Sequence, residues 1–209
     1  EAAARIMAEE GPDALSIRRL SAEVNASTMA VYTWYGSKPN LMRAVFREAF
    51  VRFGHRLMAD PTSSDPLVDL LMLGNKYRAN ALADPNMYAV MFGRSGSAVS
   101  PEPEDLVLAA GTFEILVDSV GRCVDAGILR CDPRAGAWQI WACVHGAMSL
   151  ELAQMSTEDH VAGEEAYRSV GRTVLVGLGA DPARLDVAVR DVAAAYEAAV
   201  ARDAPAESY

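Results

Sequence analysis

The residues that could carry out covalent chemistry do not form a recognisable catalytic pattern in this 209-residue sequence. Gly93–Ser97 reads Gly-Arg-Ser-Gly-Ser, which differs from the Gly-x-Ser-x-Gly turn that exposes a nucleophilic serine. Gly177-Leu-Gly179 follows a predicted helix, so it is typical of a helix end and not of a phosphate-binding loop. We therefore expect neither an enzyme nor a bound cofactor.

Metal chemistry is not indicated either. Cys123, Cys131 and Cys143 include no Cys-x-x-Cys pair and have no histidine at zinc spacing. His145 has no second histidine or carboxylate at a suitable spacing, so no metal ion is expected. We interpret the cysteines as small buried apolar side chains, with a redox-sensing pair as the alternative. We interpret His145 as a hydrogen-bonded core residue, with contact to a ligand as the alternative.

Charge is distributed unevenly along the chain. The sequence has 19 basic and 28 acidic residues, which gives a formal net charge of −9. Between Leu15 and Arg56, seven basic residues stand against two acidic ones, so this stretch carries +5 and the remainder −14. The seven are Arg18, Arg19, Lys38, Arg43, Arg47, Arg52 and Arg56. Because local charge governs attraction to phosphate, the pattern predicts a DNA-docking module on an acidic body. A merely solvated basic face is the alternative.

The hydropathy pattern predicts a globular all-α protein. Hydrophobic residues make up 51% and charged residues 22% of the chain, which is enough apolar material for a buried core. Apolar residues recur at spacings of three and four without sustained alternation, which is the period of helices. The longest apolar stretches, Leu67–Gly74 and Val174–Gly179, are too short to span a bilayer. The acidic start also lacks the features of a secretory signal, so we expect a cytoplasmic protein without a membrane partner.

Asp-Pro pairs mark where several helices begin, because aspartate caps free helix amides and proline tolerates the first helical position. They occur at residues 60–61, 65–66, 84–85, 132–133 and 181–182. Residues 60–65 form a predicted linker, and Gly93–Ser100 a predicted loop. The predicted helices run up to Glu10 and then cover Ile17–Val24, Ser27–Trp34, Ser37–Ala59, Pro66–Ala83, Pro85–Phe92, Glu104–Ala126, Pro133–Met155, Glu164–Leu178 and Pro182–Arg202.

Two short helices near the start match a helix-turn-helix in length and spacing. Ile17–Val24 and Ser27–Trp34 are joined by the dipeptide Asn25-Ala26. Such a turn usually needs one residue in the left-handed conformation, and Asn25 is the non-glycine residue best suited to it. Ser27 is well placed to cap the second helix.

The run Ser16–Phe46 resembles the DNA-binding head of TetR-family transcriptional regulators. That pattern runs roughly T-x-x-x-I-A-x-x-A-G-V-S-x-x-x-L-Y-x-Y-F-x-S-K-x-x-L. The matching positions are Ser16, Leu20-Ser21, Ala26-Ser27, Val31-Tyr32, Trp34-Tyr35, Ser37-Lys38 and Leu41. Asn25, Met29, Gly36 and Pro39 depart from the pattern, which bears on the base contacts and not on the motif.

The resemblance implies which residues meet DNA, since the second short helix would lie in the major groove. The residues expected on its DNA-facing side or beside it are Ser27, Thr28, Met29, Tyr32, Thr33, Trp34 and Lys38. Those expected at the neighbouring phosphates are Ser16, Arg18 and Arg19. Tyr32 and Lys38 would themselves contact phosphates. Core filling is the alternative for Tyr32 and Trp34, whereas Leu20 and Val31 are assigned to the core.

The resemblance also implies a division into a three-helix head, residues 1–48, and a helical body, residues 49–209, that binds ligand and dimerises. Trp138–Gly146 resembles the W-x-x-x-H-G signature of a subgroup of TetR-like C-terminal domains, with Trp141, His145 and Gly146 at the named positions. The implied dimer surface is the helix pair Pro133–Met155 and Glu164–Leu178. It carries a stripe of small residues that would let another helix approach closely, although they could equally pack within one chain. The stripe consists of Ala142, Gly146, Ser149 and Ala153.

A ligand pocket between the middle helices would draw on methionine and aromatic side chains, which accommodate varied apolar molecules. Its predicted residues are Tyr77, Met87, Tyr88, Met91, Phe92, Phe113, Trp141, His145 and Met148. Plain core packing is the alternative for each of them.

These features together predict a homodimeric DNA-binding repressor that reads a palindrome in double-stranded DNA and is released by a small, largely apolar effector. The long helix Ser37–Ala59 is the predicted lever between head and body. Two alternatives stay open. One is a TetR-like fold without DNA binding, and the other is a helical enzyme acting on a small hydrophobic substrate.

Overall fold

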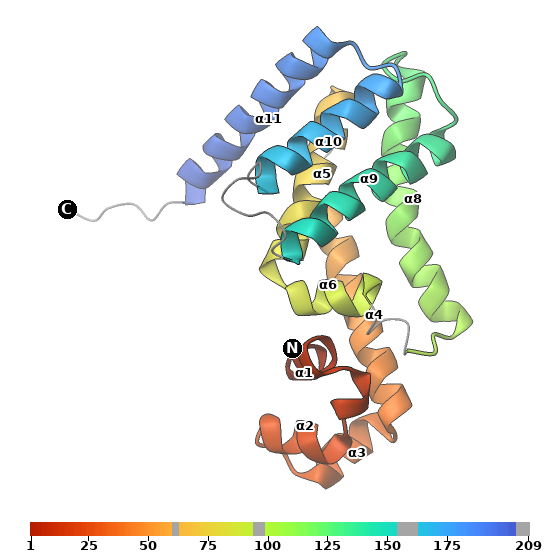
Figure 1. Cartoon of the computed structure of the whole chain (residues 1–209), viewed down its shortest axis with the longest axis vertical. Coiled ribbons are helices and arrows are strands. Elements are labelled where there is room, and N and C mark those ends of the chain that lie inside the picture. Colours follow the sequence, from red (N-terminus) through yellow and green to blue (C-terminus); the bar gives the residue numbers. More distant parts are fainter. Residues whose placement is uncertain (60–62, 94–98, 154–162, 204–209) are drawn as a thin grey trace, which may run out of the picture. The chain divides into compact units, whose positions relative to one another are not determined.

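Helices account for all regular secondary structure in the residues that the structure describes (Figure 1). The computed structural model describes residues 1–59, 63–93, 99–153 and 163–203. Within these ranges the all-α prediction is confirmed, and none of the helices has both the length and the apolar character needed to cross a membrane. The elements are α1 Ala2–Glu10, η1 Pro12–Ala14, α2 Ile17–Glu23, α3 Thr28–Tyr35, α4 Lys38–Leu57, α5 Pro66–Ala83, α6 Pro85–Phe92, α8 Pro103–Asp125, α9 Pro133–Leu152, α10 Gly163–Gly177 and α11 Pro182–Asp203.

The predicted helices agree with the observed ones to within a few residues at each end. Parts of three predicted segments lie outside the described residues. These parts are 60–62 of the linker, 94–98 of the loop, and 154–155 at the end of the helix that was expected to reach Met155.

Aspartate caps explain where four of the helices begin. Asp65, Asp84, Asp132 and Asp181 each stand just before a helix whose first residue is proline, and each side chain accepts a backbone N–H from the first turn. The donors are Leu67 at 2.8 Å, Met87 at 3.0 Å, Ala135 at 2.9 Å and Arg184 at 2.8 Å. The prediction from the Asp-Pro pairs is therefore confirmed at these four positions. The fifth pair, at 60–61, lies outside the described residues.

The described residues group into two compact units that are not continuous in sequence. Unit 1 comprises those within 1–60 and 77–114, and unit 2 those within 61–76 and 115–209. The helices α5 and α8 each contribute residues to both units. The predicted boundary after residue 48 stays a prediction.

The core of unit 1 is built around α4. Leu20 and Val31 are buried, as predicted, with exposed fractions of 7% and 2%. Helix α6 packs against both α1 and α4, and α3 contacts α2 and α4 (Figure 1). The apolar residues spaced three and four apart along α4 are buried over its whole length, which confirms the periodicity argument. They are Leu41, Val45, Phe46, Ala49, Phe53 and Leu57.

Unit 2 is held together by packing of α9 on α10 and by polar contacts that join distant segments. The Tyr167 hydroxyl donates a hydrogen bond to the Gly74 carbonyl at 2.8 Å. The Arg122 guanidinium donates to the Asp69 carboxylate at 2.6 Å, and the Asp69 side chain is only 13% exposed. Both contacts tie the first half of α5 to later helices of the same unit.

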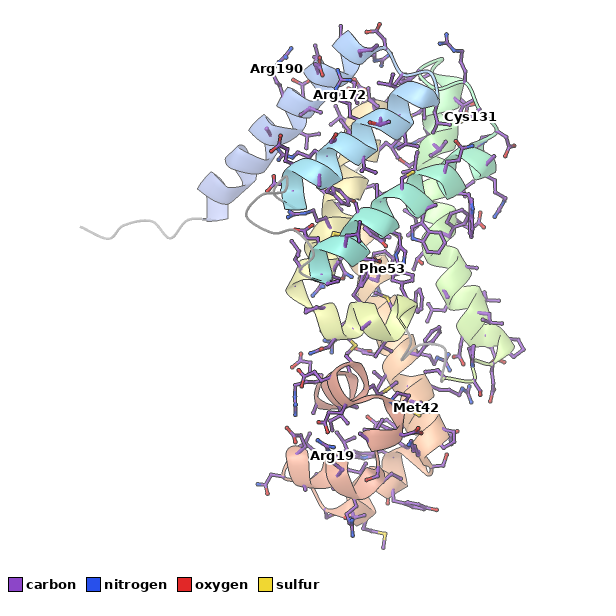
Figure 2. All side chains as sticks on the ribbon, viewed as in Figure 1. Arg19, Met42, Phe53, Cys131, Arg172 and Arg190 are labelled. Carbon is purple, nitrogen blue, oxygen red and sulfur yellow. The ribbon has the colours of Figure 1, made fainter. Side chains whose placement is uncertain are left out.

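The three cysteines occupy different environments, so the prediction that all of them are buried is wrong. Cys123 is buried, and burial raises the pKa of its thiol to about 11, which leaves it protonated at neutral pH. Cys131 is half-buried and Cys143 is exposed (Cys131 is labelled in Figure 2). Cys143 lies on the solvent side of α9. The prediction failed there because the residues around Cys143 are mostly apolar, so the sequence does not show which face of the helix is buried.

The turn between α2 and α3 has a backbone that explains why asparagine is found there. Asn25 has a φ of +51°, as predicted. Its N–H donates to the Ala22 carbonyl at 3.4 Å, and the Ala26 N–H donates to the Ser21 carbonyl at 2.9 Å. This pair of hydrogen bonds is a Schellman motif, which ends α2 and turns the chain into α3.

Replacing Asn25 tests this turn directly. We expect Asn25→Ala to lower the free energy of unfolding by about 1 kcal/mol, because alanine is strained at positive φ. Asn25→Gly is the matched control and is expected to leave stability within about 0.5 kcal/mol of the wild type. Urea denaturation followed by circular dichroism measures both. Equal stability of the alanine and glycine variants would contradict the left-handed turn.

Candidate nucleic-acid interface

Serine caps fix the three helices that form the candidate interface. The Ser16 hydroxyl accepts the Arg19 N–H at 3.1 Å, and the Ser27 hydroxyl accepts the Ala30 N–H at 3.1 Å. The Ser37 hydroxyl does the same for Asn40 at 3.3 Å. The prediction that Ser27 caps the second helix is confirmed. Each hydroxyl hydrogen is left to donate elsewhere, so Ser16 and Ser27 can cap a helix and still bond a phosphate oxygen.

The outer face of α3 carries large side chains that are not part of the core. Met29 is 74% exposed, Tyr32 57% and Trp34 71%. From the sequence we expected Tyr32 and Trp34 on or beside the DNA-facing side, with core filling as the alternative. The structure places both side chains on the surface. Thr28 and Thr33 are also exposed, and the Thr33 hydroxyl donates to the Met29 carbonyl at 2.8 Å. Because exposed apolar groups of this size usually mark a contact surface, the face is suited to binding a partner.

Many of the basic residues counted from the sequence are already paired within unit 1. The Arg19 guanidinium (Arg19 is labelled in Figure 2) donates two hydrogen bonds to Glu10 and thereby lowers the pKa of that carboxyl below its ordinary value. Arg43 pairs with Glu102 and Asp105, and Arg52 with Glu48. The local charge of +5 therefore overstates the charge that the head presents to a partner.

Arg18 and Lys38 are the cations best placed to meet an anionic partner. In the described part of the chain, the Arg18 side chain has no ion pair or hydrogen bond. Lys38 is the first residue of α4, where the backbone amides attract anions. Its Nζ donates to the Asp13 carbonyl at 3.3 Å, a contact that also ties α4 to η1. Two of the three Nζ hydrogens stay available for a phosphate.

Three of the predicted ligand residues of unit 1 lie in one aromatic cluster. The rings of Tyr77, Tyr88 and Phe92 contact one another with centroids 5.1–6.4 Å apart, and the two tyrosine hydroxyls are 2.9 Å apart. Phe50 and Phe53 of α4 complete the cluster (Phe53 is labelled in Figure 2). Neither phenylalanine was among the ligand residues predicted from the sequence. The other predicted residues of this unit are Met87 and Met91, which are buried, and Phe113, which is half-buried.

The predicted ligand residues of unit 2 lie along α9. The Trp141 ring contacts those of Trp138 and His145, with centroids 5.3 Å and 5.7 Å apart. Burial lowers the pKa of His145 below its ordinary value of 6.5, so the neutral imidazole is favoured at neutral pH. Met148 is fully buried.

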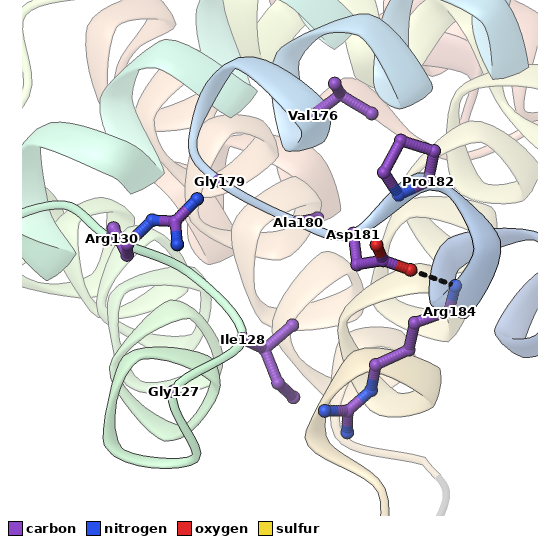
Figure 3. Close-up of a pocket in the computed structure, with 9 residues that line it drawn as sticks. All are labelled: Gly127, Ile128, Arg130, Val176, Gly179, Ala180, Asp181, Pro182 and Arg184. Carbon is purple, nitrogen blue, oxygen red and sulfur yellow. Dashed lines mark hydrogen bonds between the residues drawn. The ribbon is translucent and has the colours of Figure 1, made fainter.

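A hollow of about 350 Å³ in unit 2 was not predicted from the sequence (Figure 3). It lies where the chain leaves α10 and enters α11, and its lining includes Ile128, Val176 and Gly179. Arg130 and Arg184 bring positive charge to it, and Asp181 brings negative charge. The hollow is therefore of mixed character, unlike the apolar pocket that the sequence predicts.

Comparisons with known proteins identify a family for both the N-terminal and the C-terminal part of the chain. Residues 1–45 match the family model for bacterial regulatory proteins of the tetR family, and residues 70–174 match the tetracyclin repressor-like C-terminal domain. A search of the curated proteins found no match.

Solved structures with the same fold include three bacterial proteins. PfmR, a TetR-family transcriptional regulator from Thermus thermophilus, is 20% identical, with a TM-score of 0.66 over 84% of this chain and 96% of that one. A tetR-family regulatory protein from Rhodococcus RHA1 is 18% identical, with a TM-score of 0.68 over 86% and 94%. A protein of unknown function from Rhodococcus sp. RHA1 is 23% identical, with a TM-score of 0.72 over 85% and 91%. The predicted resemblance and fold class are thus confirmed.

Among the described residues Arg18 has no ion pair and Arg19 is paired with Glu10, so substitution of each should change the salt dependence of DNA binding by a different amount. We expect Arg18→Gln to reduce the slope of log Kd against log salt concentration by about one for a duplex of mixed sequence. Arg19→Gln is the matched control and should change the slope less, because Glu10 already compensates the Arg19 charge. Fluorescence anisotropy at several salt concentrations measures both slopes. An equal reduction in both variants would contradict the assignment.

Proposed function

Because the chain belongs to the TetR family of bacterial regulatory proteins, we propose that it is a homodimeric repressor that binds a palindromic operator and leaves it when a small, largely apolar ligand binds. Members of this family are transcription regulators and not enzymes, and this chain is likewise a DNA-binding regulator. A regulator of genes works beside the chromosome, so the proposed location is the cytoplasm. The proposed head is residues 1–48 and the proposed body residues 49–209.

The observation that carries the proposal is the exposed outer face of α3. In the proposed complex this helix lies in the major groove, where Ser27, Thr28, Met29 and Thr33 meet base edges and phosphates. The exposure of Met29 supports a contact with a thymine methyl group, because the thioether is apolar and reaches far from the helix. Trp34 adds an exposed ring at the end of the same helix.

Phosphate contacts on both sides of α3 fix its register on the duplex. The Tyr32 hydroxyl and the Lys38 ammonium are the proposed donors on the α3–α4 side. Ser16 and Arg18 are the proposed donors at the start of α2. All four residues are at least partly exposed, and Ser16, Arg18 and Lys38 lie at helix starts, where anions are favoured.

The proposed dimer surface is the pair α9 and α10. On α9, Trp138 is 58% exposed, and Ala142 and Ser149 are exposed as well, as is Ala153 just after the helix. Small side chains of this kind let a second helix approach closely, and a two-fold axis would bring the same stripe of a second copy against it. Two copies would then place two α3 helices roughly 34–36 Å apart, which is one turn of DNA.

The proposed ligand is apolar because the candidate residues offer mainly rings and thioethers. In unit 1 these are Tyr77, Tyr88 and Phe92 with Met87 and Met91, and in unit 2 they lie along α9 at Trp141, His145 and Met148. Ligand and operator would oppose each other by about 1–3 kcal/mol of coupling free energy, as is usual for linked sites.

Selection of DNA tests the operator directly. Full-length protein is incubated with fragmented DNA from its source, washed through a salt gradient, and the retained fragments are sequenced. We expect one palindromic site to be retained. Lys38→Ala and Tyr32→Phe should each weaken binding by roughly tenfold or less, and equally at all sequences, because phosphate contacts carry no base information.

Arg190→Ala is the matched control for these variants, since it removes one exposed cation from α11 and should leave the affinity unchanged (Figure 2). Uniform loss of all fragments at moderate salt would contradict the proposal, and the body would then be tested for binding or turnover of hydrophobic compounds.

Dimerisation is tested by a charge on the small-residue stripe. Ala142→Arg places a cation opposite its own copy across a two-fold axis, so we expect monomers in sedimentation velocity and a loss of palindrome binding. Ala193→Arg introduces the same side chain at an exposed position of α11 and should leave the dimer intact. A dimeric Ala142→Arg protein with full DNA affinity would contradict the assigned surface.

A further inference from the structure

Asp105 is a buried acid in the first turn of α8. Its side chain has no exposed surface, which is rare for a carboxylate and requires compensating partners. It lies in unit 1, 62 residues along the chain from one of those partners. The family resemblance and the predicted site residues give no role to this position.

One set of partners belongs to the start of α8 itself. The Asp105 Oδ2 accepts the Glu102 N–H at 2.8 Å, and Glu102 immediately precedes Pro103, the first residue of the helix. An acid three residues after the capping position that bonds back to its backbone N–H is one half of a capping box. Asp105 therefore holds the first turn of α8 in place.

The other set belongs to α4. The Arg43 Nε donates to Asp105 Oδ2 at 3.1 Å, and the Arg47 Nε is 3.2 Å from Oδ1. The second contact is an ion pair without hydrogen-bond geometry, since Oδ1 has no hydrogen-bond partner. Arg43 also pairs with Glu102. The two arginines are four residues apart, so they lie on one face of α4 and hold the carboxylate from the same side.

These contacts keep Asp105 ionised although it is buried. Burial raises its pKa, but the Glu102 N–H and the guanidinium groups of Arg43 and Arg47 outweigh this effect and lower the pKa below its ordinary value of 3.8. A buried charge is costly to separate from its partners. Rotation or sliding of α4 against the start of α8 would separate them, so the ion pairs restrict both motions.

A second contact between the same helices lies farther along α4. Gly54 is buried, and a Cβ atom built there would be 3.7 Å from the Thr112 methyl group. Thus α4 touches α8 near residue 105 and again near residue 112. Two contacts along one pair of helices define an angle, whereas one contact defines only a pivot. The helix α8 then continues as a single helix to Asp125.

We propose that Asp105 is a positioning residue that sets the angle of α4, and through α4 the position of α3, so that it determines the spacing of half-sites that the dimer accepts. The inference rests on the proposed function, since it needs two heads on one DNA. With the ion pairs intact, α4 has one angle and the dimer accepts one spacing. Without them, the heads move and several spacings are accepted at reduced affinity, because the preorganisation is lost.

The test uses the DNA site that the wild-type protein selects, together with versions whose half-sites are one or two base pairs closer or farther apart. We expect the wild type to prefer one spacing by roughly tenfold or more. Asp105→Asn keeps the shape and the capping oxygen but removes the charge, and should reduce that preference to about threefold or less. A double variant, Arg43→Gln with Arg47→Gln, should have the same effect from the α4 side.

Two controls separate positioning from a general loss of binding. Arg52→Gln removes a cation of α4 that pairs with Glu48 of the same helix and with Glu1, but not with α8, and should leave the spacing preference unchanged. Lys38→Ala should weaken all spacings by the same factor. Circular dichroism melting verifies folding. A variant that does not fold is replaced by Arg47→Gln, which removes one ion pair but leaves Arg43 against the buried carboxylate.

The outcomes are distinct. A paired site selected by the wild type, with a preference for one spacing that both variants lose, supports the proposal. The same preference retained by a folded variant would overturn the role of Asp105 and leave the proposed function intact. Failure of the wild type to select any paired site would overturn the proposed function and this inference together.

Discussion

A helix of eight residues is not stable by itself in water, and α3 has only eight. Its outer face is also exposed, so Met29 and Trp34 bury little apolar surface and add little to the stability of the helix. The helix must therefore be held by its caps and its inner side alone. Ser27 and the Schellman turn at Asn25 fix its start, and Val31 anchors it to the core. Everything that the head can do with its outer face depends on this support.

The need to hold the helices around α3 in place also explains which basic residues of unit 1 are paired with acids. Cations that hold helices in place are paired, as Arg19 is with Glu10 and Arg43 with Asp105. Arg18 and Lys38 keep donors available at helix starts next to α3. The acidic partners thus reduce the total charge of the head without reducing the charge at its proposed DNA-facing edge, where counterion release would take place.

Local sequence signals predicted the helices and the turn because their causes lie within a few residues. An aspartate before a proline, a serine cap or an asparagine at a turn acts on its own neighbours. The pairing of Arg43 with Asp105 could not be predicted, because the two residues are 62 positions apart and nothing in either segment identifies the other. The exposure of Cys143 could not be predicted either, since the residue stands in an apolar stretch and only packing decides which face of the helix is covered. The hollow beside Arg130 depends on two loops and has no sequence signature.

Amide hydrogen exchange tests the central claim that α3, supported by α4, is the part of the chain that binds DNA. The full-length protein is measured alone and with the DNA that it selects. The account predicts slower exchange from residue 27 through residue 40, covering α3 and the first turn of α4, and unchanged exchange in the first turns of α11. Unchanged exchange of the α3 amides in the DNA-bound protein would contradict the account.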